Sequence, residues 1–212
     1  MFVDGDRYHP LWRNNVRAPS IDDQVEEGGW IFGNDPDERK SAGSIIAKEN
    51  FQYILSKLAK DPKTHKIIEK IEIYTHSRGA AFGAGYVEAL LELIKQSADQ
   101  FADPNNEIDL IYNMAPNESG EDATKQIDGV NSYSQHHDYD PLSGSDMKGT
   151  KANFTSSEGG SFLGHHSTSS FVKDITAFTK AFVNSNGDSK KLIDDFVRRM
   201  QTDYGIKVTI QQ

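Results

Sequence analysis

The sequence predicts an α/β protein with a mostly parallel β-sheet and helices on both faces of that sheet. Two near-continuous apolar runs, at residues 71–74 and 108–114, are typical of strands buried on both faces of a parallel sheet. Between them, residues 79–94 place apolar side chains at helical spacing. Because strand, helix and strand in this order form a βαβ unit, neighbouring strands are expected to run parallel.

Length and charge limit the class of protein. The chain has 212 residues, of which 36% are hydrophobic, so we expect one domain that spans residues 1–212. A formal net charge of −9 argues against nucleic-acid binding and gives no attraction to an anionic membrane surface. No run approaches the ~20 apolar residues of a transmembrane helix. Cysteine is absent, so neither disulfides nor a thiolate zinc site is expected.

The N-terminal residues carry no cationic region followed by a long apolar core, so no signal peptide is recognised. We therefore expect a chain that is cytoplasmic as made, or one delivered as part of a larger exported protein. Residues 2–5 look like the end of a short buried strand, and residues 7–12 like a loop. A strand this close to the start indicates a small domain whose usual first strands are missing or lie upstream.

The next elements follow from periodicity and turn residues. A short strand is expected at residues 29–33 and a turn at 34–37. Residues 41–58 predict an amphipathic helix that covers one sheet face. Its apolar residues are Ile45, Ile46, Tyr53, Ile54, Leu55 and Leu58.

In the second half, residues 118–129 predict a crossover with a short helix, and residues 130–135 predict one more strand. Residues 143–170 are rich in serine, glycine and threonine, and we interpret them as one long functional loop. Apolar stripes over residues 171–182 and 192–200 predict two helices. Residues 207–210 are a candidate final strand.

The motif THSRG, at residues 75–79, lies where a strand gives way directly to a helix. A serine on such a turn projects its hydroxyl above the sheet edge, and the backbone N–H of the following residue points toward a developing oxyanion. Ser77 is therefore the candidate nucleophile and the Arg78 backbone a candidate oxyanion donor. Thr75 replaces the first glycine of the G-x-S-x-G pattern, so its crowding must be relieved in another way. Alternatively, Ser77 only caps the helix.

A serine nucleophile needs a base and an orienting carboxylate, which α/β-hydrolases supply in the chain order Ser, Asp, His. The acid candidates are Asp140 and Asp138, which follow the second strand after Ser77. Base candidates are His166 and His165, in the long loop before a late helix.

Further residues complete the expected site. The second oxyanion donor should come from the loop after the first strand, which makes the backbone of Gly5 and Asp6 candidates. His76 is expected to lie beneath the turn, because adjacent strand residues face opposite ways. The Arg78 side chain is expected to pair with a surface acid, or to meet a phosphate or carboxylate of the substrate.

Four short motifs together resemble the core of α/β-hydrolase lipases: THSRGA, MAP, DPL and HS, at residues 75–80, 114–116, 140–142 and 166–167. The chain looks like class 3 lipases and the lipase-like effector domains of bacterial polymorphic toxins, over roughly residues 67–185. The resemblance implies an α/β-hydrolase fold, no cofactor and no metal. It also favours Asp140 over Asp138 as the acid and His166 over His165 as the base. An effector would have a cognate inhibitor or a delivery protein as partner.

Three function classes therefore compete. The leading one is a serine esterase or lipase that acts on a lipid or other ester. A second is a non-catalytic binding module that keeps a degenerate hydrolase fold, which Thr75 favours. The third is a metal-dependent hydrolase, because several side chains offer nitrogen and oxygen ligands for zinc or manganese, although their spacing matches no known motif. These side chains are His136, His137, Asp138, Asp140, His165 and His166.

Overall fold

The computed structural model describes residues 2–4, 7–9, 35–127, 129–144, 146–157, 166 and 168–211. In this part of the chain one seven-stranded sheet has the order β2-β1-β3-β4-β5-β6-β7. The five middle strands run parallel, and the two edge strands β2 and β7 are antiparallel to their neighbours. The predicted α/β class with a mostly parallel sheet is therefore confirmed. The strands are β1 (Phe2–Asp4), β2 (Arg7–His9), β3 (Ile71–His76), β4 (Ile108–Met114), β5 (Ser132–His137), β6 (Ala152–Ser156) and β7 (Val208–Gln211).

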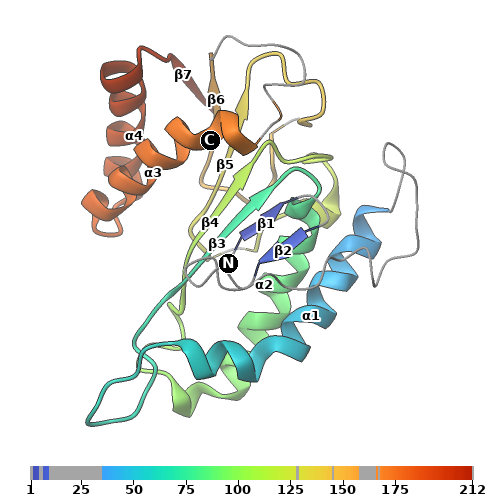
Figure 1. Ribbon diagram of the computed structural model, residues 1–212, viewed down its shortest axis with the longest axis vertical. Helices are drawn as coiled ribbons and strands as arrows, with labels where there is room; N and C mark the ends of the chain where they lie inside the picture. The colour runs from blue at the N-terminus through green and yellow to red at the C-terminus, as the bar shows by residue number, and fades with distance from the viewer. Residues whose placement is uncertain are drawn as a thin grey trace.

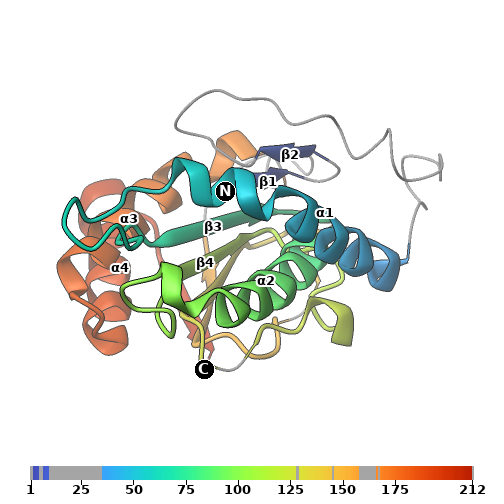
Figure 2. The ribbon, with the colours of Figure 1, turned by 90° about the horizontal axis from the view of Figure 1, so that it is seen from below.

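Helices cover both faces of the sheet, as predicted (Figures 1 and 2). The parallel strands lie side by side in chain order, and right-handed crossovers then place their connecting helices on the same face. That face carries α1 (Pro36–Lys57) and α2 (Gly79–Gln96). The chain covers the other face only after the last parallel strand, with α3 (Val172–Ser185) and α4 (Ser189–Tyr204).

Each face of the sheet buries its own apolar cluster, which explains the continuous apolar runs in β3 and β4. Toward α1 and α2 the cluster is mainly aliphatic. Toward α3 and α4 the cluster holds more aromatic rings, among them Phe178. The Phe178 ring stacks on Tyr112 with 4.2 Å between centroids and meets Tyr133 edge-on at 5.2 Å. The aromatic stripe predicted over residues 171–182 therefore packs in the core.

The inward face of α1 differs from the predicted one. Ile45 is 54% exposed and Tyr53 is also exposed, although both were predicted to cover the sheet. Gly43 faces α2 instead, where a Cβ atom would lie 2.0 Å from the backbone oxygen of Phe82. The close approach of two helix backbones, which only small residues permit, therefore decides which side of α1 is buried.

Two predicted loops contain strands. Arg7–His9 forms β2, which pairs antiparallel with β1. Ala152–Ser156 forms β6 within the predicted loop over residues 143–170, and it pairs with β5. Its sequence ANFTS carries too few apolar residues to show a strand pattern, yet most of it is buried between β5 and β7. The strand predicted at residues 29–33 lies outside the described residues.

Three short 3₁₀ helices complete the described elements: η3 (Ala98–Gln100), η4 (Asp122–Thr124) and η5 (Thr168–Phe171). The second of these is the short helix predicted in the crossover between β4 and β5. Within the described residues, no helix is both long enough and apolar enough to span a bilayer.

Candidate active site

The turn at Ser77 is as tight as the sequence predicts. β3 ends at His76 and α2 begins at Gly79, so only Ser77 and Arg78 connect them. Ser77 has φ +55°, a left-handed conformation that costs a non-glycine residue on the order of 1 kcal/mol or more. Its N–H donates to the Met114 carbonyl at 3.0 Å. This bond to the neighbouring strand helps hold the strained turn.

Thr75 fits before this turn because a glycine lies opposite it. A Cβ atom on Gly83 of α2 would lie 2.6 Å from Cγ2 of Thr75. The Thr75 hydroxyl donates to Oδ1 of Asn113 at 2.6 Å, so its polar atom is satisfied although the residue is fully buried. The space normally provided by a glycine before the serine is therefore provided by a glycine one turn inside the helix.

His166 connects the candidate nucleophile to the candidate acid. Its Nε2 lies 2.6 Å from Oγ of Ser77, and its Nδ1 lies 2.8 Å from Oδ2 of Asp140. A carboxylate only accepts hydrogen bonds, so Nδ1 carries the proton. In the neutral imidazole Nε2 is then left to accept the Ser77 hydroxyl proton. The structure thus brings together Ser77, His166 and Asp140, from three distant parts of the chain.

Asp140 is held as an ionised acceptor. Its buried carboxylate accepts hydrogen bonds from the Leu142 N–H at 3.0 Å and the Ser143 hydroxyl at 2.6 Å, besides His166. Burial by itself raises the pKa of Asp140, but the hydrogen bonds from His166 and Ser143 outweigh it and bring the pKa to about 2. Asp138, the alternative acid, is half-buried, and its N–H donates to the Ser156 carbonyl in the β5–β6 ladder.

The segment after β4 ties the turn at Ser77 to the loop that carries the acid. The Asn117 N–H donates to the Ser77 carbonyl at 3.2 Å, and its side-chain Nδ2 donates to the Leu142 carbonyl at 2.9 Å. In addition, the Gly144 N–H donates to the Pro116 carbonyl at 3.1 Å. Asn117 was not predicted, because nothing in its local sequence indicates which two loops it joins.

The candidate oxyanion donors are described only in part. Arg78 is the N-cap residue of α2, so the amides around it lie at the positive end of the helix dipole. In the parallel register between β1 and β3, Asp4 is opposite His76, so β1 ends at the same edge of the sheet. Gly5 and Asp6 lie outside the described residues, as does the alternative base His165.

The two adjacent histidines of the metal hypothesis face opposite sides of β5. His136 Nε2 lies 2.8 Å from Oγ1 of Thr155, and burial lowers the pKa of His136 although nearby carboxylates oppose the change. His137 Nε2 lies 3.2 Å from Oδ2 of Asp174 on α3. Among the residues whose positions are described, no group of three or more histidine, aspartate or glutamate side chains is arranged to hold a metal ion.

The His137–Asp174 pair was missed by the sequence analysis. Both side chains are fully buried, and the Ser156 hydroxyl donates to Oδ1 of Asp174 at 3.1 Å. One sequence signal could have identified this aspartate. Asp174 lies three residues after Phe171 and four before Phe178, on the same stripe of buried aromatic residues. A charged residue on such a stripe indicates a buried partner.

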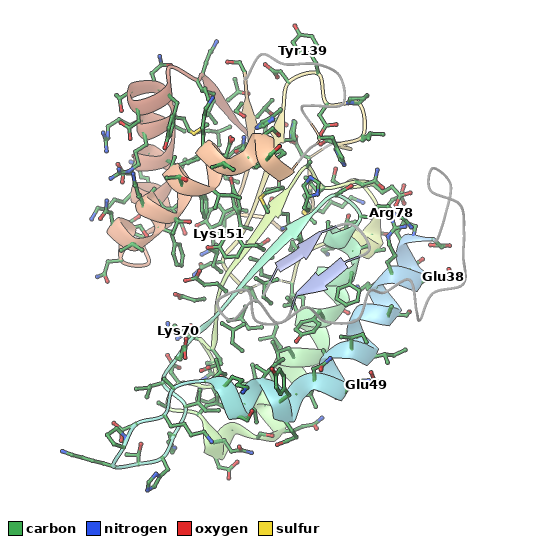
Figure 3. The ribbon with its side chains drawn as sticks, in the orientation of Figure 1. Glu38, Glu49, Lys70, Arg78, Tyr139 and Lys151 are labelled. Atoms are coloured by element: carbon green, nitrogen blue, oxygen red, sulfur yellow. The ribbon has the colours of Figure 1, made fainter. Side chains whose placement is uncertain are left out.

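Exposed apolar side chains come from the segments that hold the acid and the base. Tyr139, immediately before Asp140, is 88% exposed, and Leu142 and Val172 are also exposed. Figure 3 shows Tyr139 pointing outward at the end of the molecule where Arg78 lies, whereas Lys70 lies toward the other end. Tyr139 and Leu142 thus flank the candidate acid in sequence with exposed apolar side chains.

No protein-family model matches the chain, and no curated protein matches it. The geometry of the three residues around Ser77 is therefore the basis for a functional proposal.

Proposed function

We propose that the chain is a serine hydrolase of the α/β-hydrolase type that cleaves carboxylic esters through Ser77, His166 and Asp140. The observation that carries the proposal is the continuous line of hydrogen bonds from the Ser77 hydroxyl through both ring nitrogens of His166 to the Asp140 carboxylate. A serine hydroxyl is a weak nucleophile unless a base accepts its proton, and this geometry provides that base.

In the acylation step, Oγ of Ser77 attacks the ester carbonyl carbon while its proton passes to Nε2 of His166. The carbonyl oxygen becomes an oxyanion that the Arg78 N–H and the N-terminus of α2 stabilise. Asp140, ionised because its pKa is about 2, stabilises the imidazolium that forms. His166 then gives the proton to the leaving alcohol, and an acyl ester on Ser77 remains.

In the deacylation step, a water molecule attacks this acyl ester and gives its proton to Nε2 of His166. The second oxyanion collapses, Oγ of Ser77 takes the proton back, and the carboxylic acid leaves. Atoms balance across the two steps: one ester and one water give one alcohol and one acid. His166 alternates between base and acid, which requires an imidazole that is neutral at the working pH.

The topology supports the assignment to the α/β-hydrolase type. Ser77, Asp140 and His166 follow the carboxyl ends of β3, β5 and β6, which is the chain order Ser, Asp, His of that fold. In an open α/β sheet, the carboxyl ends of the strands are where ligands bind.

Lipid or phospholipid acyl esters are the substrate class that we favour. The exposed side chains of Tyr139, Leu142 and Val172 would contact an acyl chain, which the net charge of −9 would not repel. We therefore expect esters of long acyl chains to be cleaved with a higher kcat/KM than acetyl or butyryl esters of the same alcohol.

Labelling with a fluorophosphonate probe, followed by mass spectrometry of the adduct, tests the nucleophile before any substrate is known. We expect one adduct on Ser77, because the base lies beside this hydroxyl. Ser77→Ala should abolish both labelling and ester hydrolysis and leave the melting temperature nearly unchanged, since it removes one partly exposed hydroxyl.

A second serine lies beside a histidine, so the position of the adduct distinguishes two sites. The Ser170 hydroxyl is 3.4 Å from Nδ1 of His137, in the buried His137–Asp174 pair. An adduct on Ser170, or no adduct on the folded protein, would contradict the proposed site. Hydrolysis that survives in Ser77→Ala would contradict it as well.

A further inference from the structure

A buried side chain next to the candidate nucleophile contacts the backbone of the candidate base. Nε2 of His76 lies 2.6 Å from the carbonyl oxygen of His166, and His76 is 5% exposed. A carbonyl oxygen only accepts hydrogen bonds, so Nε2 of His76 carries a proton and donates it. The side chain of His76 thus holds the peptide group from which the base projects.

The ring of His76 contacts the ring of Phe171. The two rings meet edge-on, with 6.1 Å between centroids. Phe171 also stacks on His137, with 4.1 Å between ring centroids and an interplanar angle of 11°. The Asp174 carboxylate then holds His137 at 3.2 Å. A continuous series of contacts therefore runs from α3 through Phe171 to the peptide of His166.

The His137–Asp174 pair does not have the environment of a second catalytic centre. Both side chains are completely buried, and Phe171 covers one face of the imidazole. The Ser170 hydroxyl is 3.4 Å from Nδ1 of His137, compared with 2.6 Å between Ser77 and His166. A buried pair that joins β5, β6 and α3 is suited to holding neighbouring segments in place.

We infer that His76 is a positioning residue for the base, and that the His137–Asp174 pair keeps Phe171 in place beneath it. This inference rests on the proposed function, because it assigns His166 the role of base. His76 and Ser77 are adjacent at the end of β3. One strand end therefore carries both the nucleophile and the donor that fixes the base, so the two move together and the 2.6 Å contact between Ser77 and His166 is preserved.

A matched pair of variants tests the role of the donor. His76→Gln keeps an N–H donor that extends about as far from the backbone as Nε2 of histidine, whereas the amide of His76→Asn is one methylene shorter. We expect the rate of fluorophosphonate labelling to fall about 100-fold in His76→Asn and to stay within roughly tenfold of the native rate in His76→Gln. His76→Phe, which keeps a ring against Phe171 but has no donor, should behave like His76→Asn.

A proton NMR spectrum gives a readout that does not depend on activity. The Nδ1 proton of His166, shared with a buried carboxylate, should give a far-downfield signal in the native protein and in His76→Gln. We expect this signal to be lost or broadened in His76→Asn and His76→Phe. Melting temperatures of all variants show whether each one is folded.

The outcomes separate the two proposals. If the native protein is not labelled on Ser77, the proposed function fails. If the native protein is labelled, but folded His76→Asn and His76→Phe match it in labelling rate and downfield signal, only the positioning role of His76 is wrong. Equal losses in the Gln and Asn variants would also contradict a role that depends on the reach of the donor.

Discussion

The two acid candidates are two residues apart, yet only Asp140 faces the base. Asp140→Asn should lower kcat for ester hydrolysis on the ~10⁴ scale known for the loss of a triad acid. The physical reason is that an amide N–H facing Nδ1 of His166 would favour the wrong tautomer. Asp138→Asn is the matched control, and its effect on kcat should be much smaller. Steady-state kinetics on one ester substrate compares the two variants.

The reverse ranking of these variants would reassign the acid to Asp138, and equal small losses would mean that neither carboxylate orients a base. The pKa of about 2 adds a second expectation for Asp140. Its folded-state pKa is lowered from 3.8, so its hydrogen bonds stabilise the fold above that pH and lose this effect as the pH falls toward 2. If the protein loses activity in acid at a pH above 4, we therefore expect the cause to be the protonation of a group other than Asp140.

Individual site residues could be predicted from the sequence where their order along the chain indicates their role. Ser77 could be chosen because it follows a strand, and chain order narrowed the acid to Asp138 or Asp140 and the base to His165 or His166. The resemblance to lipases then favoured Asp140 and His166. The roles of His76 and Asp174 could not be chosen in this way. Their partners are the His166 carbonyl and the His137 ring, which lie far from His76 and Asp174 in sequence and meet them only in the folded chain.

At the scale of elements, the contact between β3 and α2 makes a prediction about Gly83. Gly83→Ala should lower the free energy of unfolding by about 1–3 kcal/mol, because the new methyl group would lie 2.6 Å from Cγ2 of Thr75. Thr75→Ser removes that methyl group and keeps the hydroxyl that donates to Asn113. Adding Thr75→Ser to Gly83→Ala should therefore recover part of the loss, as measured by chemical denaturation.

The double-mutant cycle of these two changes is its own control. A coupling free energy close to zero would show that Gly83 does not make room for Thr75. Fluorophosphonate labelling of the same variants links packing to the site. Gly83→Ala alone should slow labelling of Ser77, because the strand end and the helix start would move apart, and Thr75→Ser in the same chain should partly reverse the effect.

The predicted elements differ from the observed ones where side-chain pattern and packing disagree. α1 ends where the sequence predicts, but it begins at Pro36, inside the predicted turn at residues 34–37 and five residues before the predicted start. Its buried side is decided by Gly43, which lets the backbones of α1 and α2 approach each other. β6 was missed because Ala152 and Phe154 are the only apolar residues in it. Its stability comes from pairing with both β5 and β7, which a local pattern does not reveal.

At the scale of the whole molecule, strand order explains how distant residues meet. β3, β4, β5 and β6 are neighbours in both sequence and space, and they run in the same direction. The segments that follow them therefore leave at one edge of the sheet, which brings together residues 77, 140 and 166. For β3 and β4 this outcome could be predicted from the apolar runs and the βαβ order of the elements, whereas β6 was not predicted. The edge strand β7 was predicted, at residues 207–210, and it is observed at Val208–Gln211. The strand β2 was not predicted, and neither was the antiparallel pairing of the two edge strands, because short antiparallel additions have no comparable rule.

At the opposite end of the sheet, the buried carboxyl group of Glu107 destabilises the fold when it ionises. Glu107 lies immediately before β4, is 3% exposed, and has no hydrogen-bond partner for Oε1 among the described residues. Burial raises its pKa to about 7, although Lys70 opposes the change. The unfolded chain releases this proton near pH 4.5. Ionisation therefore favours unfolding, and the free energy of unfolding should fall as the pH rises from about 4.5 to about 7.

Glu107→Gln removes this ionisation and keeps the shape of the side chain. The variant should be more stable than the native protein by about 1–2 kcal/mol near pH 8, and should show no advantage near pH 4, where Glu107 is protonated in both states. Glu49→Gln, on an exposed part of α1, is the control and should leave the pH dependence unchanged. Urea denaturation at several pH values measures the difference. Parallel curves for Glu107→Gln and the native protein would show that the pKa of Glu107 is the same in the folded and unfolded chains, which would contradict this prediction. Labelling of Ser77 should be the same in all three proteins, because Glu107 and Ser77 lie at opposite ends of the parallel strands.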